Sequence, residues 1–411
     1  MKVGVLAQEF LINTGANDLL KNFLVALNSN ETVELYFIVP PSDVRMEQKI
    51  KKRNPRILIK VRPLKKIARS ILKLLNRGIK VVNPVSPSEF SLYFDAAPSM
   101  RLVESRIDEK SLLKLRTDYE IDVFFPSIFD LGQKLPYITY WPDCQPKHFP
   151  EFFDDESQKV RDSLIVSLLN CGHPMIINSQ NARGDMGRFY SADMSNIHAL
   201  PFAPFLPPKD LLPYGDKIQK YGLPSEFFVV CNQFWIHKSI ETIFEAIRGT
   251  PRSERIPVVF TGRMSEPRFP GYIENLLKKI DDFEISEHVV LLGYISKEDQ
   301  LAIVSSALAV LQPTLFEGGP GGGSVYDAIA LGVPSIVSDI PINREIVSKF
   351  TDVQFFKPKD SKSLSELMRR FTQQERTRPD YELLFQSSKL NIELLGENLV
   401  SVLSTEADKF K

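Results

Sequence analysis

Short apolar runs alternate with helical patterns twice along this chain, and this alternation limits the possible folds more than any other feature. In the first half, the valine-rich run Lys2–Gln8 precedes a glycine-containing turn, a helical pattern over 19–27 and a second apolar run at Val33–Val39. A second series begins near residue 227 and continues to about residue 356. Because strands that alternate with helices pair in parallel, the sequence predicts an α/β protein with two doubly wound parallel-sheet domains.

A proline-rich stretch separates the two series. Residues 199–215, ALPFAPFLPPKDLLPYG, contain five prolines, and repeated proline interrupts both helices and strand pairing. We therefore expect an N-terminal domain over 1–205 and a second domain that begins at residue 206. A ligand of two such domains is expected in the cleft between them, outside the carboxyl ends of the strands.

The segment 311–345, LQPTLFEGGPGGGSVYDAIALGVPSIVSDIPINRE, is the most distinctive part of the second series. Five of the twenty glycines of the chain lie between Gly318 and Gly323, after Glu317 and before a helical pattern. Glycine lets backbone N–H groups approach a ligand closely, and the following helix offers further donors to an anion. A diphosphate is the ligand that this pattern favours, and a surface loop is the alternative. The candidate nucleotide-binding residues of this segment are Gly318, Gly319, Gly321, Gly322, Gly323, Ser324 and Asp327.

Other strand ends of the second series also carry polar side chains. Lys238 and Arg263 follow apolar runs and are suited to neutralise a diphosphate, and Tyr294 follows a third run. Since the carboxyl ends of parallel strands meet at one edge of a sheet, these residues are expected near Glu317. Glu317 is suited to accept hydrogen bonds from sugar hydroxyls, and Asp327 from a ribose diol. A helix cap or a surface ion pair is the structural alternative for each of these residues.

Motifs for several other chemistries are absent from the sequence. No two aspartates are separated by a single residue, and no two of the five histidines have metal-ligand spacing. A G-x-S-x-G elbow and a Walker loop are also absent. The sequence therefore predicts nucleotide binding without a metal held by the protein and without a further cofactor.

Basic residues are concentrated in one region, although the net charge of the chain is zero. Between Arg45 and Lys80 there are fourteen basic residues and one acidic residue, and apolar residues over 64–75 recur at helical spacing. A cationic amphipathic helix can rest on an anionic membrane surface, and an ordinary solvated helix is the alternative. Nucleic acid is not expected as a partner, because no aromatic residue in this region offers stacking.

The cysteines and the N-terminus indicate a cytoplasmic protein. Three cysteines lie far apart, and the first ten residues, MKVGVLAQEF, resemble a strand and not a signal peptide. We therefore expect a cytoplasmic location, peripheral on the inner face of the cell membrane if the basic region binds lipid.

Several segments together resemble a known family. FEGGPGGGSVYDAIALGVPSIVSDIPINRE, CNQFWIHKSIETIFEAI, VVFTGR and HVVLLGYISKEDQLAIVSSALAVLQPTLFEG are similar to the donor-binding half of retaining glycosyltransferases of the GT-B fold, family four. YWPDCQPKHFPEFF and the RFY at 188–190 resemble members that build bacterial surface polysaccharides. The resemblance covers most of the chain. It implies two Rossmann-like domains that face a cleft, with a donor domain over 206–387 and a C-terminal helix at about 388–411 that packs back on the first domain.

The resemblance also implies roles for residues of the second domain. Glu317 matches the first glutamate of the family's E-x7-E motif, which contacts the donor sugar, and Asp327 matches the second, which contacts the ribose. Lys238 matches the lysine that binds the diphosphate. The spacing from Glu317 to Asp327 is ten residues where the family has eight, which indicates a loop lengthened by two residues. Gln233 replaces an arginine of the family, so Arg263 is expected to supply part of the neutralising charge.

In the first domain, the resemblance implies that Gly15 belongs to a small loop near the phosphates. It also implies that Asp143 and His148 line the sugar and acceptor side, although Pro146 stands where many relatives have histidine. Together with Glu317 and Lys238, these two residues are the candidate catalytic set.

The expected function is that of a retaining, metal-independent hexosyltransferase. The donor is expected to be a UDP- or GDP-sugar, and the acceptor a glycan, lipid-linked, in polysaccharide, O-antigen or lipopolysaccharide biosynthesis. Two alternatives remain open from the sequence: a nucleotide-sugar epimerase of the same fold, and a non-catalytic subunit that binds a sugar nucleotide.

Overall fold

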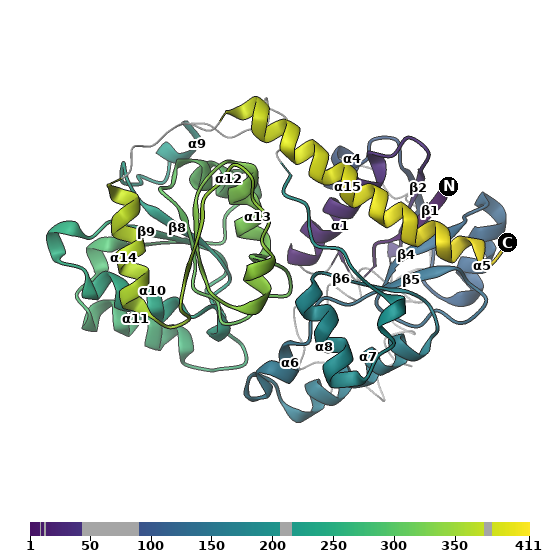
Figure 1. The fold of residues 1–411 in the computed structure, drawn as a ribbon, viewed down its shortest axis with the longest axis horizontal. Helices are drawn as coiled ribbons and strands as arrows, with labels where there is room; N and C mark the ends of the chain where they lie inside the picture. The colour runs from purple at the N-terminus through teal and green to yellow at the C-terminus, as the bar shows by residue number, and fades with distance from the viewer. Residues whose placement is uncertain (9, 12–13, 43–89, 206–215, 374–379) are drawn as a thin grey trace, which may run out of the picture. The chain divides into compact units, whose positions relative to one another are not determined.

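A computed structural model describes residues 1–8, 10–11, 14–42, 90–205, 216–373 and 380–411 (Figure 1). The basic region 45–80, for which we expect membrane binding, lies outside the described residues.

The first sheet has seven strands in the order β3-β2-β1-β4-β5-β6-β7. The strands are β1 Lys2–Leu6, β2 Glu34–Val39, β3 Arg101–Glu104, β4 Val123–Ser127, β5 Tyr137–Tyr140, β6 Met175–Ile177 and β7 Ile197–Ala199. The helices along this part of the chain are α1 Thr14–Asn28, α4 Ser91–Ala96, α5 Glu109–Tyr119, α6 Gln145–His148, α7 Asp155–Asn170 and α8 Gln180–Tyr190.

The second sheet has six strands in the order β10-β9-β8-β11-β12-β13. Its strands are β8 Phe228–Cys231, β9 Val258–Thr261, β10 Val289–Gly293, β11 Val310–Gln312, β12 Ser335–Ser338 and β13 Val353–Phe356. The helices along this part are α9 Asp216–Gln219, α10 Ile240–Gly249, α11 Tyr272–Asp282, α12 Lys297–Ser306, α13 Gly322–Ala330, α14 Ser361–Thr372 and α15 Tyr381–Asp408. The strand pairs of this sheet are parallel, so the predicted doubly wound α/β class is confirmed.

The strand order of the second sheet creates a switch point between β8 and β11. The chain fills one side of β8 with β9 and β10 and then returns to the other side with β11. The connections after β8 and β11 therefore diverge at the carboxyl edge, where doubly wound sheets leave a crevice for ligands.

The apolar run of β8 is explained by burial on both faces. Phe228 and Val230 pack with residues of α10, α11 and α14, while Phe227 and Val229 pack with residues of α12 and α13. Figure 1 shows these two groups of helices on opposite faces of the sheet. A strand covered on both sides has no polar face, so its sequence is continuously apolar.

The chain divides into two compact units that do not follow the sheets. One unit contains Met1–Tyr140, Asn170–Pro174 and Gly396–Lys411, and the other contains Trp141–Leu169 and Met175–Leu395. Helix α15 contributes to both. The domain limits 1–205, 206–387 and 388–411 remain a prediction. No helix among the described residues is both long and apolar enough to cross a membrane.

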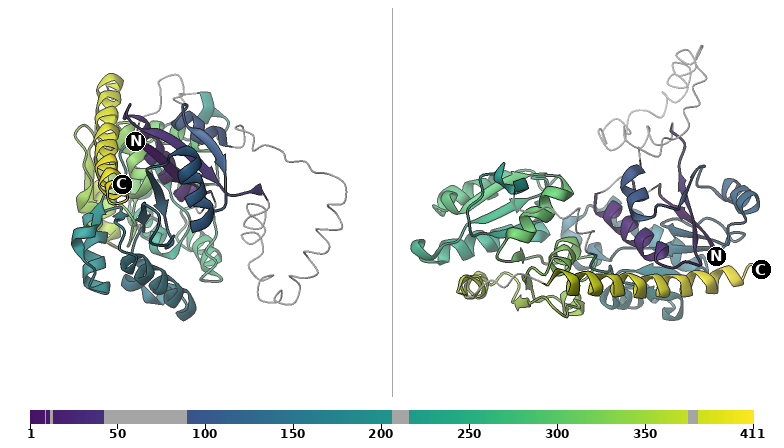
Figure 2. Two further views of the ribbon diagram at one scale, coloured as in Figure 1. Left: turned by 90° about the vertical axis from the view of Figure 1, so that its right-hand side faces the viewer. Right: turned by 90° about the horizontal axis from the view of Figure 1, so that it is seen from above.

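Within the first unit, α15 approaches the backbone of α1 closely at Gly396 (Figure 2). A Cβ atom at position 396 would lie 2.2 Å from the carbonyl oxygen of Ala26. Backbone atoms cannot move aside as a flexible side chain can, so only glycine fits here without a shift of one helix.

We expect Gly396→Ala to lower the free energy of unfolding by about 1–3 kcal/mol, because the overlap exceeds the helix propensity that alanine gains. Gly249→Ala is the matched control, since a Cβ atom there meets no atom within 4 Å. Urea unfolding measures both variants. Equal stability of the two would contradict the close approach.

The end of α15 is also fixed by a buried polar contact in the same unit. His173 Nδ1 lies 2.5 Å from Glu406 Oε1, and both side chains are buried. Burial raises the pKa of Glu406, but the contacts with His173 and Lys409 outweigh this effect and hold the pKa below its ordinary value.

Because the pKa of Glu406 is lower in the folded chain than in the unfolded chain, its ionised form stabilises the fold at neutral pH. Glu406→Gln should therefore lower the melting temperature at pH 7. The difference from the wild-type chain should shrink as the pH falls below the ordinary pKa of glutamate. Thermal unfolding at pH 7 and in acid tests this, with Glu397→Gln, an exposed glutamate of the same helix, as control, and a difference that grows in acid would refute it.

Candidate active site

An ion pair occupies the switch point of the second sheet. Lys238 ends a 3-10 turn, Ile236–Lys238, that follows β8, and Glu317 follows β11. Lys238 Nζ contacts Glu317 Oε1, and the two side chains are only 11% and 9% exposed. The structure therefore brings together the two second-domain residues that the sequence nominates for catalysis.

Burial of this ion pair costs hydration free energy, and the loss of either partner would destabilise the fold. Each charge loses hydration on burial, and their mutual attraction offsets that loss only while both are present. Gln312, the last residue of β11, donates from Nε2 to Glu317 Oε1 over 3.1 Å and also to the carbonyl of Gly321. Its Oε1 atom is buried and has no partner among the described residues. Within the described residues, Gln312 Oε1 is therefore an acceptor without a hydrogen bond, and it belongs to the same site as Glu317 Oε1, which already accepts two.

The glycine loop closes against the same carboxylate. Gly321 and Gly322 have φ values of +72° and +63°, a region that favours glycine. A Cβ atom at Gly322 would also lie 2.9 Å from Glu317 Oε2. The amide of Gly321 donates to Asn343 Oδ1 over 3.0 Å, which fixes the loop to the segment after β12.

Helix α13 begins directly after this loop, at Gly322. The first amides of a helix have no intrahelical acceptor and favour an anion. Ser324 lies in this first turn, and its buried hydroxyl has no partner among the described residues. The start of α13 therefore offers backbone and hydroxyl donors beside the Lys238–Glu317 pair.

The segment that contains Asp143 and His148 lies along the glycine loop, within the same compact unit. A Cβ atom at Gly318 would lie 3.0 Å from Asp143 Oδ2. The ring of His148 lies 5.4 Å from that of Phe316. The two candidate catalytic residues of the first half thus contact the neighbours of Glu317 on either side.

The remaining glycines of the loop have different surroundings. A Cβ atom at Gly319 would lie 3.5 Å from the Cβ of Asn178, whereas one at Gly323 would meet no atom within 4 Å. Gly15 lies in the first turn of α1, in the other compact unit.

Asp327 lies on α13 and is held by α12. Lys297 Nζ is 2.5 Å from Asp327 Oδ2, and Gln300 Nε2 donates to the same oxygen over 3.2 Å. Arg263 and Tyr294 are exposed; Arg263 lies two residues after the end of β9, and Tyr294 directly follows β10. Because the strands are parallel, both residues lie at the carboxyl edge that also carries Lys238.

Glu266 is a buried carboxylate that the sequence does not predict as a site residue. It stabilises the turn that carries Lys238. Glu266 accepts the amide of Ile236 at 2.9 Å and the guanidinium of Arg268 at 2.8 and 2.7 Å. Burial raises the pKa of Glu266, but these hydrogen bonds outweigh it and hold the pKa below its ordinary value. Burial, with Lys238 and Arg268 nearby, lowers the pKa of His237 to about 2. His237 is therefore neutral, and Lys238 is the cation of this turn.

Among the described residues, no group of three or more His, Cys, Asp or Glu side chains is arranged to hold a metal ion. The site instead combines a lysine, helix amides and a serine hydroxyl with the acceptors of Glu317 and Gln312. This set can hold an anion on one side and hydroxyl groups on the other.

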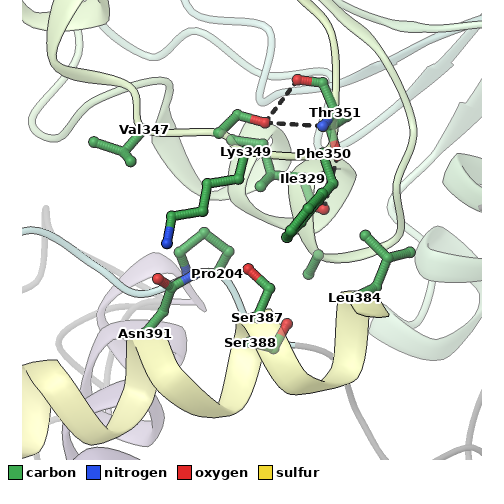
Figure 3. A pocket seen from close by; sticks show the side chains of 12 residues that line it. Pro204, Ile329, Val347, Lys349, Phe350, Thr351, Leu384, Ser387, Ser388 and Asn391 are labelled. Carbon is green, nitrogen blue, oxygen red and sulfur yellow. Dashed lines mark hydrogen bonds between the residues drawn. The ribbon is translucent and has the colours of Figure 1, made fainter. Parts of the chain in front are cut away.

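A pocket of about 370 Å³, including its open mouth, lies at the other end of α13 (Figure 3). It is lined by Ile329 and Ala330, by the loop 347–351 and by α15, and the side chain of Lys349 extends over Pro204 toward Asn391. The candidate site lies at the N-terminal end of α13, so the two places are distinct.

Comparison with known proteins finds a family match within the second half of the chain. Residues 216–382 match the family described as "Glycosyl transferases group 1". That range contains Lys238, Glu317, the glycine loop and α13.

One characterised relative matches part of the chain. The O-antigen chain mannosyltransferase RfbU of Salmonella typhimurium is 24% identical over 233 residues, which are 56% of this chain and 59% of that protein. The match thus spans about three fifths of the length of that relative.

Solved structures match the whole chain at low sequence identity. Sucrose-phosphate synthase from Thermosynechococcus elongatus has a TM-score of 0.61 and 12% identity, with 100% of this chain and 98% of that chain covered. HepE from Anabaena, in complex with UDP and glucose, has a TM-score of 0.55 and 12% identity, with 100% and 99% covered. Such likenesses show the fold alone. The match to the glycosyl transferases group 1 family covers residues 216–382, which is less than half of the chain, and the two parallel-sheet domains have the GT-B fold that the solved structures share.

Proposed function

We propose that this chain is a retaining glycosyltransferase that transfers a hexose from a nucleoside diphosphate sugar to a glycan acceptor. The observation that carries the proposal is the buried Lys238–Glu317 pair beside the start of α13, at the switch point of the second sheet. The match of residues 216–382 to the glycosyl transferases group 1 family and the similarity to a mannosyltransferase support it.

In this proposal the diphosphate binds between Lys238 and the N-terminus of α13. Phosphate oxygens replace Glu317 as the acceptors of Lys238 Nζ, and Ser324 and the amides of the glycine loop supply further donors. The released Glu317 carboxylate then accepts hydrogen bonds from hydroxyls of the donor sugar. The two residues of the buried pair thus bind two different parts of the donor, Lys238 the diphosphate and Glu317 the sugar.

The base and ribose are assigned to the neighbouring strand ends. Asp327 accepts hydrogen bonds from the ribose diol, in place of one of its contacts with α12. Arg263 contributes charge to the diphosphate, and Tyr294 lies beside the nucleotide. Gly15 is proposed to approach the phosphates from the first domain. The donor is a UDP- or GDP-sugar, and no metal or other cofactor is required.

The transfer step needs stabilisation of the leaving group more than a protein nucleophile. The bond between the anomeric carbon and the phosphate oxygen breaks, and the negative charge that develops is stabilised by Lys238 and the loop amides. The acceptor hydroxyl forms the new bond on the same face and gives its proton to a phosphate oxygen. In this proposal Asp143 and His148 line the side of the sugar and the acceptor.

The acceptor is proposed to be a lipid-linked glycan of polysaccharide or O-antigen biosynthesis. The similarity to the O-antigen mannosyltransferase of Salmonella typhimurium supports this assignment. A cytoplasmic protein that binds the inner face of the membrane through residues 45–80 would meet such an acceptor.

Removal of either charge of the pair should abolish transfer and destabilise the fold. Lys238→Met or Glu317→Gln leaves one buried charge without its partner, at a cost of about 3–5 kcal/mol. The double variant Lys238→Met/Glu317→Gln removes both charges and should regain most of that stability. Transfer by the double variant should remain at least about 100-fold below wild type, because the diphosphate has lost its cation.

Product formation and urea unfolding on the same four proteins separate the two effects. Arg252→Gln, in an exposed ion pair with Glu287, is the control for loss of a positive charge. Recovery of transfer in the double variant would show that the pair serves stability alone.

A thermal-unfolding screen identifies the donor. A nucleotide sugar at 100 times its dissociation constant stabilises the folded chain by about 2.7 kcal/mol. We expect a UDP- or GDP-sugar to raise the melting temperature and dTDP-glucose to have less effect. Asp327→Asn should reduce the shift, and no shift with any nucleotide would contradict donor binding.

Two further measurements separate the alternatives. Conversion of the donor sugar in the absence of an acceptor would favour an epimerase. Binding of UDP or GDP without turnover across an acceptor panel would favour a non-catalytic subunit.

A further inference from the structure

A buried carboxylate in the second unit has no part in the site described above. Asp185 lies on α8 and is 6% exposed. Its Oδ2 atom is 2.6 Å from Nε2 of His148, the candidate residue at the end of α6. A buried carboxylate needs such a partner, because burial without a hydrogen bond is costly.

The imidazole ring of His148 is also held by two aromatic rings. Phe189, on the same helix as Asp185, meets it edge-on with ring centres 5.3 Å apart. The ring centre of Phe316, the residue before Glu317, lies 5.4 Å from that of His148. Three contacts thus fix the orientation of His148 relative to the segment that carries Glu317.

The contact with Asp185 also decides which ring nitrogen carries the proton. A carboxylate only accepts hydrogen bonds, so Nε2 of His148 must donate to it. In the neutral imidazole the other nitrogen, Nδ1, then has a free lone pair. Nδ1 lies on a different edge of the ring from Nε2 and is available to accept a hydrogen bond.

We propose that Asp185 is a positioning residue, which holds His148 in the tautomer whose Nδ1 accepts a hydrogen bond from a hydroxyl group of the sugar substrate. This inference rests on the proposed transferase function. It adds a residue that has no motif in the sequence, and it gives His148 a defined role as an acceptor next to Glu317. Asp185 touches no substrate and acts only through the imidazole.

The competing explanation is that Asp185 only ties α8 to α6. The two explanations differ for Asp185→Asn, which keeps the shape of the side chain. The amide of asparagine can donate to Nε2, and the neutral ring then carries its proton on Nδ1. A structural tie would survive this change, whereas the acceptor at Nδ1 would be lost.

The test combines nitrogen NMR with kinetics on the full chain. Ring nitrogen shifts are measured at pH 8.5 on protein labelled with ¹⁵N-histidine, with His148→Gln to assign the signals. We expect a protonated Nε2 and a bare Nδ1 in the wild type, and the reverse in Asp185→Asn. With UDP-glucose, UDP-galactose and GDP-mannose as donors, kcat of Asp185→Asn should fall about 10- to 100-fold, the size of one lost hydrogen bond to a charged or oriented group.

Binding of UDP and GDP should not change in Asp185→Asn, and Asp193→Asn, an exposed aspartate in the same region, should retain the wild-type kcat. A proton on Nδ1 in the wild type would overturn the proposal. A reversed tautomer with an unchanged kcat would also overturn it. The NMR result does not depend on turnover, so absence of any transfer or nucleotide binding by the wild type would count against the proposed function and not against the tautomer.

Discussion

The ion pair between Lys238 and Glu317 is the interaction on which the rest of the site depends. Two buried charges are tolerated at the end of the second sheet because each is the partner of the other. Strand order brings them together, since β8 and β11 are neighbours although 79 residues separate the two side chains. The pair places a cation and a carboxylate at the switch point, where a doubly wound sheet leaves a crevice.

The surrounding structure is shaped to keep this pair in place. Glycine at 322 lets the loop pass beside the carboxylate of Glu317, and Gln312 links that carboxylate to the loop backbone. On the other side, Glu266 holds the turn that carries Lys238, and the neutral His237 adds no second charge. These contacts fix the positions of Lys238 and Glu317, and in the proposed function this order reduces the cost of binding an anionic donor.

The sequence predicts those features that depend on local pattern and on strand order. Alternating runs predict the parallel sheets, and the rule that strand ends share an edge places Lys238 close to Glu317. Contacts between side chains distant in sequence cannot be predicted in this way. Asp185 and Glu266 lie in segments with no motif, and only the tertiary fold brings them to His148 and to the Lys238 turn. The ion pair between Lys297 and Asp327 likewise depends on how α12 packs beside α13.

The central claim is that Lys238 of the buried pair holds the diphosphate of a nucleotide sugar, while Glu317 accepts hydrogen bonds from its sugar. Calorimetric titration of UDP and GDP into the wild-type chain and into a stably folded Lys238→Met/Glu317→Gln chain tests it most directly. The account predicts that one of the two nucleotides binds the wild type and that the double substitution weakens this binding at least about 10-fold, as expected for loss of a charged hydrogen bond. Equal affinity of the two proteins would contradict the account.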